Sequence, residues 1–418
     1  MCASMLGTRR SLDEYRGCVG GEQIEEIAAL AKPLRGCRML HVSALPSRSQ
    51  LIDAVNALVP LLRAVGIVAE WRTIPSKLHQ VEVNRTMNHA LDGHFVRWTP
   101  RMHANWLDYQ AIPAGAFSGG YDFVVIHGAE LAGTVDTTPR VGEAAGARWI
   151  WHCHADLSKV QPDIWDLLSI YVRQYDRTIM CSYDEGAGFS DRCYATVSPN
   201  IDPLSPRNCE LPRTFVEMVL RQHRLDPERP IALYVLRNGE DPSVTSCNVD
   251  GFLMAKERVQ GLQLIVLVQG EENDQLAHTH FRHLVGKLGD CPDARLIPVA
   301  NGVGNVEINA LQRAAAVVLE WSDGAELATG ALEAMWKARP LVVGVAAAGR
   351  LGVEDGRNVC VAHSAEECGD RIASLIESPL KAQAIGKGAS EYVRERFLIT
   401  EVLVAYLTLL RELARQQR

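Results

Sequence analysis

The chain has 418 residues, a length that suits two domains better than one. Apolar residues make up 47% of it and charged residues 22%, as in ordinary soluble globular proteins. The formal net charge of -7 disfavours nucleic acid or an anionic membrane as a partner. No apolar run reaches the roughly 20 residues of a membrane span, and the polar start predicts no signal peptide. The cysteines form no CxxC pair, which indicates reduced thiols in the cytoplasm and no zinc site.

The first half of the chain predicts an α/β domain. An amphipathic helix at 21–34 precedes a strand at 38–43, a helix at 51–66 and a strand at 68–74. This order is a βαβ unit. Further strands are expected at 122–127, 149–154, 178–181 and 195–197. Together they predict one doubly wound domain over residues 1–205.

A turn-rich stretch at 199–208, PNIDPLSPRN, predicts the boundary to a second domain. The strands expected beyond it lie at 231–236, 263–268, 294–298, 315–319 and 341–345. They predict a second doubly wound domain over 206–385. The remaining segment, 386–418, contains a long helix expected at 400–415.

The stretch at 322–344, SDGAELATGALEAMWKARPLVVG, predicts a turn, an apolar helix at 327–337 and a buried strand. A helix start beside a parallel strand is a good place to hold a nucleotide or a phosphate. Glu333 lies among the apolar residues of that helix, where a carboxylate needs a partner. The ribose hydroxyls of a nucleotide and a nearby arginine or lysine are both candidates.

These residues carry a resemblance. ALEAMWKARPLVVG resembles the donor-site helix of the retaining GT-B glycosyltransferases of family four. EVNRTMNHALDG, WIWHCHADLS and SPNIDPLSPRN are similar to trehalose glycosyltransferring synthases, and the likeness extends over most of the chain. It implies two Rossmann-like domains, with 1–205 on the acceptor side and 206–385 binding a nucleotide sugar. It also implies that the helix in 386–418 packs back on the first domain, and that the protein is a homodimer.

The resemblance assigns roles to residues around the donor sugar. Glu333 matches the carboxylate that holds the ribose, and the position eight before it, where relatives carry a second carboxylate, is Ala325, with Glu326 beside it. Arg237 matches the arginine that neutralises the leaving diphosphate, a task that suits its rigid fork. His154 matches the histidine that contacts the transferred sugar. It ends an expected strand, where ligands of parallel sheets bind, although a core histidine is the alternative. Arg237 and His154 are the expected catalytic residues.

Other donor contacts are expected in loops. Asn301 and Gly302 belong to a glycine loop where relatives seat the base. Ser49 and Gln50 lie in SALPSRSQ, which replaces a glycine turn whose amides approach the diphosphate. The lysine that relatives place after the arginine is not matched, and Lys256 is the candidate replacement.

The expected acceptor side comprises Arg85, Asn88 and His89 in EVNRTMNHALDG, with an exposed helix surface as the alternative, and His127 in VVIHGAEL. Relatives carry an aspartate directly after this last histidine, but this chain has Gly128. Losing a hydrogen-bonding partner from a buried site costs about 1–3 kcal/mol, so the change points to an altered acceptor.

The sequence thus predicts a metal-independent, retaining glycosyltransferase. It would move a sugar from a nucleotide diphosphate sugar to a small acceptor. The nucleotide sugar is a co-substrate, and no cofactor is expected. The departures at the substrate residues favour an unusual sugar or acceptor, such as a thiol in S-glycosylation for antibiotic biosynthesis. One alternative is a trehalose synthase that uses UDP- or ADP-glucose and glucose. The other is a degenerate protein that only binds a nucleotide sugar.

Overall fold

The computed structural model describes residues 10–45, 49–112, 114–117, 119–137, 146–155, 157, 160–180, 194–197, 199–236, 242–268, 275–299, 304–321 and 329–416. Contacts divide the chain into two compact units. Unit 1 comprises Met1–Asn200 with Leu398–Arg418, and unit 2 comprises Ile201–Phe397. The sequence placed the divisions after 205 and after 385, whereas the contacts place them after 200 and after 397. The C-terminal boundary shifts because α15 (Pro379–Arg396) packs on α12 (Thr329–Trp336) and α14 (Ala365–Glu377) of unit 2. The chain changes unit only before α16 (Ile399–Arg415).

Unit 1 is built on a six-stranded sheet of order β2-β1-β3-β4-β5-β6, in which neighbouring strands pair in parallel. The strands are β1 (Arg38–Leu45), β2 (Val68–Pro75), β3 (Phe123–His127), β4 (Arg148–His152), β5 (Arg177–Met180) and β6 (Tyr194–Thr196). All the expected strands are present. The fourth ends at His152, so His154 lies just beyond a strand rather than at its last residue. The order reverses between β1 and β3, the point at which open α/β sheets bind ligands.

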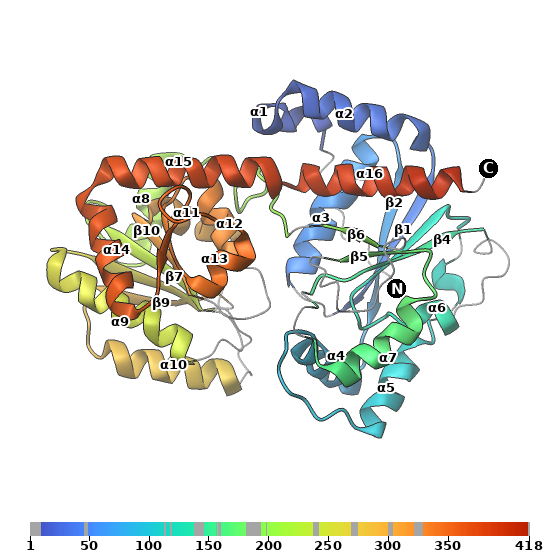
Figure 1. The fold of residues 1–418 in the computed structure, drawn as a ribbon, viewed down its shortest axis with the longest axis horizontal. Coiled ribbons are helices and arrows are strands. Elements are labelled where there is room, and N and C mark those ends of the chain that lie inside the picture. Colours follow the sequence, from blue (N-terminus) through green and yellow to red (C-terminus); the bar gives the residue numbers. More distant parts are fainter. Residues whose placement is uncertain are drawn as a thin grey trace. The chain divides into compact units, whose positions relative to one another are not determined.

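Helices cover both faces of this sheet (Figure 1). On one face α4, α5 and α7 enclose a core of aliphatic and aromatic side chains that includes Trp106, Trp149 and Trp151. On the other, α16 packs on α2, α3 and β6, and α3 packs on β2. The helices are η1 (Leu12–Tyr15), α1 (Arg16–Val19), α2 (Gly21–Ala31), η2 (Lys32–Leu34), α3 (Ser49–Ala64), α4 (Leu78–Leu91), α5 (Pro100–Gln110), η3 (Ala114–Phe117), α6 (Thr134–Thr137), α7 (Pro162–Val172) and α16.

Strand alternation sorts the histidines of this sheet onto one face. Successive side chains of a strand point to opposite sides. Val42, Ile126 and Trp151 belong to the core under α4, α5 and α7, so their neighbours His41, His127 and His152 point to the side of α16. His127 and His152 are direct partners in the register of β3 and β4.

Unit 2 has a six-stranded sheet of order β12-β11-β10-β7-β8-β9, again with parallel pairings. The strands are β7 (Ile231–Leu236), β8 (Gln263–Val268), β9 (Ala294–Pro298), β10 (Val317–Glu320), β11 (Leu341–Gly344) and β12 (Cys360–Ala362). Every residue of β7 and of β8 is buried, as expected of strands covered on both faces. The sequence missed β12, whose three residues are too few to show a pattern. The predicted α/β class with two doubly wound sheets is confirmed.

The helices of unit 2 also lie on both faces of their sheet. α9, α10 and α14 share one apolar core with the strands, whereas α11 and α12 contact β7, β10 and β11 from the other side. Their bounds are α8 (Arg213–Gln222), α9 (Pro242–Arg258), α10 (Gln275–Leu288), α11 (Asn305–Ala314), α12 (Thr329–Trp336), α13 (Val345–Leu351), α14 (Ala365–Glu377) and α15.

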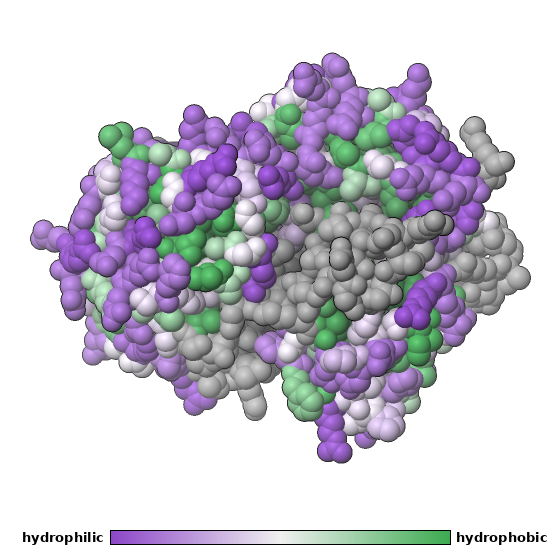
Figure 2. Space-filling model, viewed as in Figure 1, coloured by the Kyte–Doolittle hydropathy of each residue, from purple (hydrophilic) through white to green (hydrophobic). Residues whose placement is uncertain are grey.

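Among the described residues, no helix combines the length and the apolar character that crossing a bilayer requires. On the face drawn in Figure 2, hydrophilic side chains separate the apolar ones into patches.

Candidate functional site

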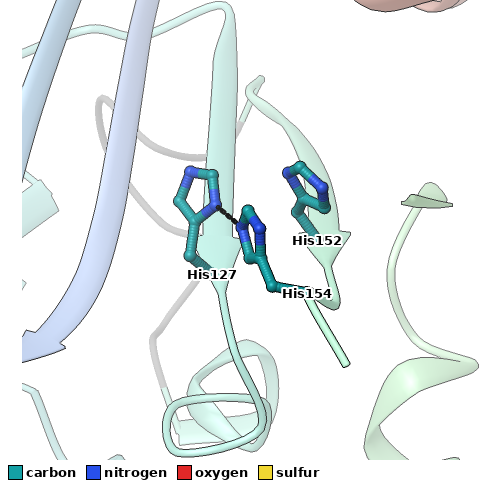
Figure 3. Close-up of side chains that lie close together, drawn as sticks. All are labelled: His127, His152 and His154. Carbon is teal, nitrogen blue, oxygen red and sulfur yellow. Dashed lines mark hydrogen bonds between the residues drawn. The ribbon is translucent and has the colours of Figure 1, made fainter. Parts of the chain in front are cut away.

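Three histidines of unit 1, from β1, from β3 and from the segment after β4, form a hydrogen-bonded row. His41 Nδ1 lies 2.9 Å from His127 Nε2, and His127 Nδ1 lies 2.9 Å from His154 Nε2. Figure 3 shows the second of these bonds, at the carboxyl end of β3. His41 and His127 are fully buried, whereas His154 is half-buried. The predicted pair of His127 and His154 is therefore in direct contact, and the sequence missed His41.

A fourth histidine completes the cluster. The ring of His152 stacks on that of His154 at a centroid distance of 3.9 Å, and its Nδ1 lies 2.6 Å from the hydroxyl oxygen of Tyr406 in α16. Burial, reinforced by His154, lowers the pKa of His41 to about 3. Burial and the neighbouring histidines hold the pKa values of His127 and His152 well below the ordinary value. These three rings are therefore neutral near pH 7.

Three of these histidines lie close enough together to be considered as ligands of one metal ion. One ligand nitrogen each from His127, His152 and His154 lies within 4.8 Å of the others. A metal must lie in the plane of every imidazole that binds it, so the nitrogen lone pairs must converge. The rings of His152 and His154 are stacked with an interplanar angle of 29°, so their lone pairs run side by side. The arrangement suits mutual hydrogen bonding better than coordination.

A buried carboxylate fills the space beside Gly128, the residue after His127, and it was not predicted from the sequence. Glu130 is 2% exposed, and its Oε1 accepts a hydrogen bond of 3.0 Å from Asn88 Nδ2. Its Oε2 occupies the space that a Cβ on Gly128 would need. Gly128 has a φ of 82°, a conformation that favours glycine. The aspartate that relatives carry at position 128 is absent, and the carboxylate of Glu130 lies against Gly128 instead.

The predicted acceptor residues of α4 have different surroundings. Asn88 is half-buried and points to Glu130, whereas Arg85 is exposed. His89 meets the ring of His94 edge to face at 5.9 Å. Asn88 is thereby connected to the segment that follows β3.

Glu333 of unit 2 lies in α12, in the middle of the predicted helix, and is 6% exposed. Its carboxylate is 2.9 Å from Arg207 Nε and accepts a hydrogen bond of 3.0 Å from Gln312 Nε2. Of the two partners that the sequence left open, the described contact is the arginine, which comes from the PNIDPLSPRN turn. The carboxylate is held in a fixed orientation by these two donors.

A lysine is buried behind Glu333. Lys337 is 5% exposed, and its Nζ donates to Gln312 Oε1 at 2.7 Å, to Asn208 Oδ1 at 2.9 Å and to the Glu333 carbonyl oxygen at 3.1 Å. Burial lowers its pKa to about 7 although Glu333 acts in the opposite direction. Turn, α11 and α12 are thus joined by one polar network. The feature of the sequence that could have indicated the role of Lys337 is its spacing of four residues from Glu333.

Lys256, the candidate replacement for the missing second cation, is bound elsewhere. It forms an ion pair with Asp293, which Arg229 also contacts at 2.5 Å. It lies fourteen residues beyond Pro242 at the start of α9, or about 21 Å along a helix. Since β7 enters α9 from the Pro242 end, this lysine cannot serve a diphosphate near Arg237, and that expectation is wrong.

The remaining predicted donor residues cannot be compared with the structure. Arg237, Asn301, Gly302 and Glu326 lie outside the described residues. Ser49 and Gln50 begin α3, but their side chains also lie outside what is described. Their roles stay predictions.

The chain is similar to known proteins along almost its whole length. Residues 51–185 match the family described as "Trehalose synthase, N-terminal domain". The trehalose synthase of Thermococcus litoralis is 31% identical over 409 residues, with 97% of each chain covered. That of Pyrococcus horikoshii is 29% identical over 409 residues, with the same coverage. The structure of α,α-trehalose 6-phosphate synthase from Burkholderia multivorans superimposes with a TM-score of 0.67 and 14% identity, and 90% of this chain and 100% of that one are covered. The chain therefore belongs to the trehalose synthase family of GT-B glycosyltransferases.

Proposed function

We propose that the protein transfers a glycosyl group, with retention of configuration, from a nucleoside diphosphate sugar to a small polyhydroxylated acceptor. Glu130 is the observation that carries this choice of acceptor. Its buried carboxylate beside Gly128 offers the hydrogen-bond acceptor that relatives supply with an aspartate at that position. A carboxylate accepts bonds from adjacent hydroxyls, as a sugar offers them.

The donor is proposed to bind in unit 2. The Glu333 carboxylate, held by Arg207 and Gln312, retains acceptor capacity for the two ribose hydroxyls, since an ionised carboxylate offers about four lone-pair sites. The strand order of unit 2 reverses between β7 and β10. Arg237, the residue after β7 in the sequence, is proposed to neutralise the leaving diphosphate.

In the proposed reaction, the acceptor oxygen attacks the anomeric carbon on the face from which the diphosphate leaves. The new bond is formed between that oxygen and the anomeric carbon, and the bond to the diphosphate oxygen breaks. The departing phosphate takes the acceptor proton. The described cysteines are free thiols, which supports a reducing compartment such as the cytoplasm.

Formation of trehalose from UDP- or ADP-glucose and glucose is the specific reaction that we place first, because the full-length relatives are named trehalose synthases. The second candidate is transfer of a different sugar, or transfer to a thiol in specialised metabolism. Ala325, eight positions before Glu333, favours it, since a carboxylate there would contact the transferred sugar.

A two-stage experiment tests the proposal. Thermal unfolding is first followed with UDP, ADP, GDP and their glucose conjugates, because a ligand at a hundred times its Kd stabilises by about 2.7 kcal/mol. Each stabilising conjugate is then incubated with glucose or with a small thiol, and the anomeric protons of the product are observed by NMR. An α,α-linked product from glucose supports the first candidate, and a thioglycoside alone supports the second. If no nucleotide stabilises the protein and no product forms, the proposed function is wrong.

A further inference from the structure

The buried lysine behind Glu333 is fixed by three hydrogen bonds. Lys337, the residue after α12, donates from Nζ to Gln312 Oε1 at 2.7 Å, to Asn208 Oδ1 at 2.9 Å and to the Glu333 carbonyl oxygen at 3.1 Å. An ammonium group carries three N–H donors. These bonds therefore use its full donor capacity, and the position of Nζ is set by the protein itself.

The shortest of these bonds ends on Gln312 of α11, whose side chain is 0% exposed. The other end of the same amide, Nε2, donates to Glu333 Oε2 at 3.0 Å and lies 3.5 Å from the Gly330 carbonyl oxygen. A side-chain amide has an acceptor oxygen on one side and a donor nitrogen on the other. Gln312 thus joins the ammonium of Lys337 to the carboxylate of Glu333.

Only one orientation of this amide satisfies both neighbours. If its oxygen and nitrogen exchanged places, Oε1 would face the Glu333 carboxylate and Nε2–H would face the Lys337 ammonium. Each contact would then join two acceptors or two donors in a fully buried position, where unsatisfied polar groups are costly. Loss of the lysine proton would remove only the conflict at Nζ. The same orientation, with the donor toward Glu333, is therefore favoured in either protonation state of the lysine.

We propose that Lys337 is a positioning residue for nucleotide binding, which holds the Glu333 carboxylate ready for the ribose hydroxyls through the amide of Gln312. This inference deepens the proposed function and rests on it for the identity of the ligand. Every residue that it invokes belongs to unit 2. Arg207 contributes charge to the carboxylate, whereas Gln312 contributes a neutral donor whose direction is set by the lysine.

The preference for ribose over deoxyribose distinguishes this role from a merely structural one. The member of UDP, ADP and GDP that binds the parent protein most tightly is compared with its 2′-deoxy form by titration calorimetry. The parent should prefer the ribonucleotide about ten- to a hundred-fold, because the deoxy form lacks one hydrogen bond to a charged group. In Lys337→Met this preference should fall about five-fold, with the affinity for the 2′-deoxy form unchanged. The matched control Lys381→Met, in α15 of the same unit, should keep the parent's preference.

A second variant tests the route through the amide. Gln312→Met should reduce the preference at least as much as Lys337→Met does. The double variant Lys337→Met/Gln312→Met should lose no more than Gln312→Met alone, and a further loss would overturn the proposed route. Replacing both partners of a buried hydrogen bond by apolar groups is milder than replacing one. Should Lys337→Met fail to fold, Gln312→Met and the double variant therefore still decide the outcome, and an undiminished preference in Gln312→Met overturns the inference.

The remaining outcomes separate this inference from the proposed function. A parent protein that binds none of the nucleotides, or binds one without preferring ribose, overturns the inference together with the ribose contact assigned to Glu333. A parent that prefers ribose, with an equal preference in Lys337→Met, overturns the inference alone. Equal loss of affinity for both forms of the nucleotide in Lys337→Met indicates a merely structural lysine and likewise overturns it.

Discussion

Arg207 and Glu333 form an ion pair of 2.9 Å in unit 2, although 126 positions separate them in the chain. The arginine belongs to the turn at the start of the unit, and the carboxylate belongs to α12. The pair is only partly exposed, since the arginine side chain is 20% accessible and the carboxylate side chain 8%. A carboxylate held in this way is oriented before any ligand arrives, which is the condition for a ribose clamp with little reorganisation.

Replacing Glu333 by glutamine tests this clamp. Glu333→Gln removes the charge and half of the acceptor capacity, and it removes the ion pair with Arg207, which keeps a hydrogen bond to Asn305. Affinity for the nucleoside diphosphate should fall about ten- to a hundred-fold, because a hydrogen bond to a charged group is worth about 1.5–3 kcal/mol. Isothermal titration measures the change. The matched control is Glu367→Gln, which breaks an ion pair with Arg371 in α14 of the same unit. Unchanged affinity in Glu333→Gln would show that this carboxylate is purely structural.

Restoring the aspartate that relatives carry after His127 should damage this chain. Gly128→Asp places a side chain in a φ region that favours glycine, and its Cβ overlaps the Glu130 carboxylate. We expect a loss of about 2 kcal/mol or more in the free energy of unfolding. Removing the obstruction in Gly128→Asp/Glu130→Ala should recover part of that loss. Urea unfolding of the parent protein, both single variants and the double variant gives the coupling energy, and simple additivity would contradict the proposed competition for one space.

The buried lysine predicts a dependence of stability on alkaline pH. The pKa of Lys337 is lowered from 10.5 to about 7 in the folded protein. Between these values the unfolded chain binds more protons than the folded one, so stability should rise with pH by about 1.4 kcal/mol per unit. The charged groups that act on this lysine are Glu333, Arg313 and Arg207.

Lys337→Met retains much of the volume and removes the titrating group. The variant should lose the rise in stability between pH 7 and 10. Lys381→Met, at a lysine of α15 that donates to the Ser374 hydroxyl, should keep it. Urea midpoints at several pH values in this range measure both slopes. A parent protein whose stability is flat across the range would show that the lysine stays charged when folded.

Much of the fold could be predicted from sequence because the information is local. Runs such as FVVIH and QLIVLV are too short for helices and too apolar for exposed strands, and both form fully buried strands. The C-terminal helix, the turn at 199–208 and the burial of the segment around Glu333 were likewise visible in neighbouring residues. Within the described residues, the predicted strands differ from the observed ones mainly at their end residues. The three-residue β12 was not predicted.

The site was predicted less completely because its partners converge from separate elements. His127 and His154 were found since each follows an apolar run, but His41 lies inside β1, where one polar residue among apolar ones gives no sign of its neighbours. Glu130 was not predicted because it does not align with the aspartate of the relatives. Gly128 has a positive φ and no side chain, so the carboxylate of Glu130, two residues later, fills the space beside it. Arg207 was not identified because no feature of the surrounding turn sequence connects it to Glu333.

The histidine row predicts a loss of stability in acid. His41 is neutral in the folded protein, with its pKa lowered to about 3 by burial and by His154, whereas an unfolded histidine titrates near 6.5. Stability from this group is complete above about pH 6.5 and is lost as pH falls toward 3, by about 1.4 kcal/mol per unit, because only the unfolded chain takes up the proton. His41→Asn removes the titrating ring and keeps a donor toward His127, so its stability should fall less steeply than that of the parent between pH 6 and 4. Comparing the two proteins by urea unfolding cancels the carboxylates that they share. Parallel slopes would mean that the ring of His41 accepts a proton in the folded state, which the absence of any partner for its Nε2 among the described residues argues against.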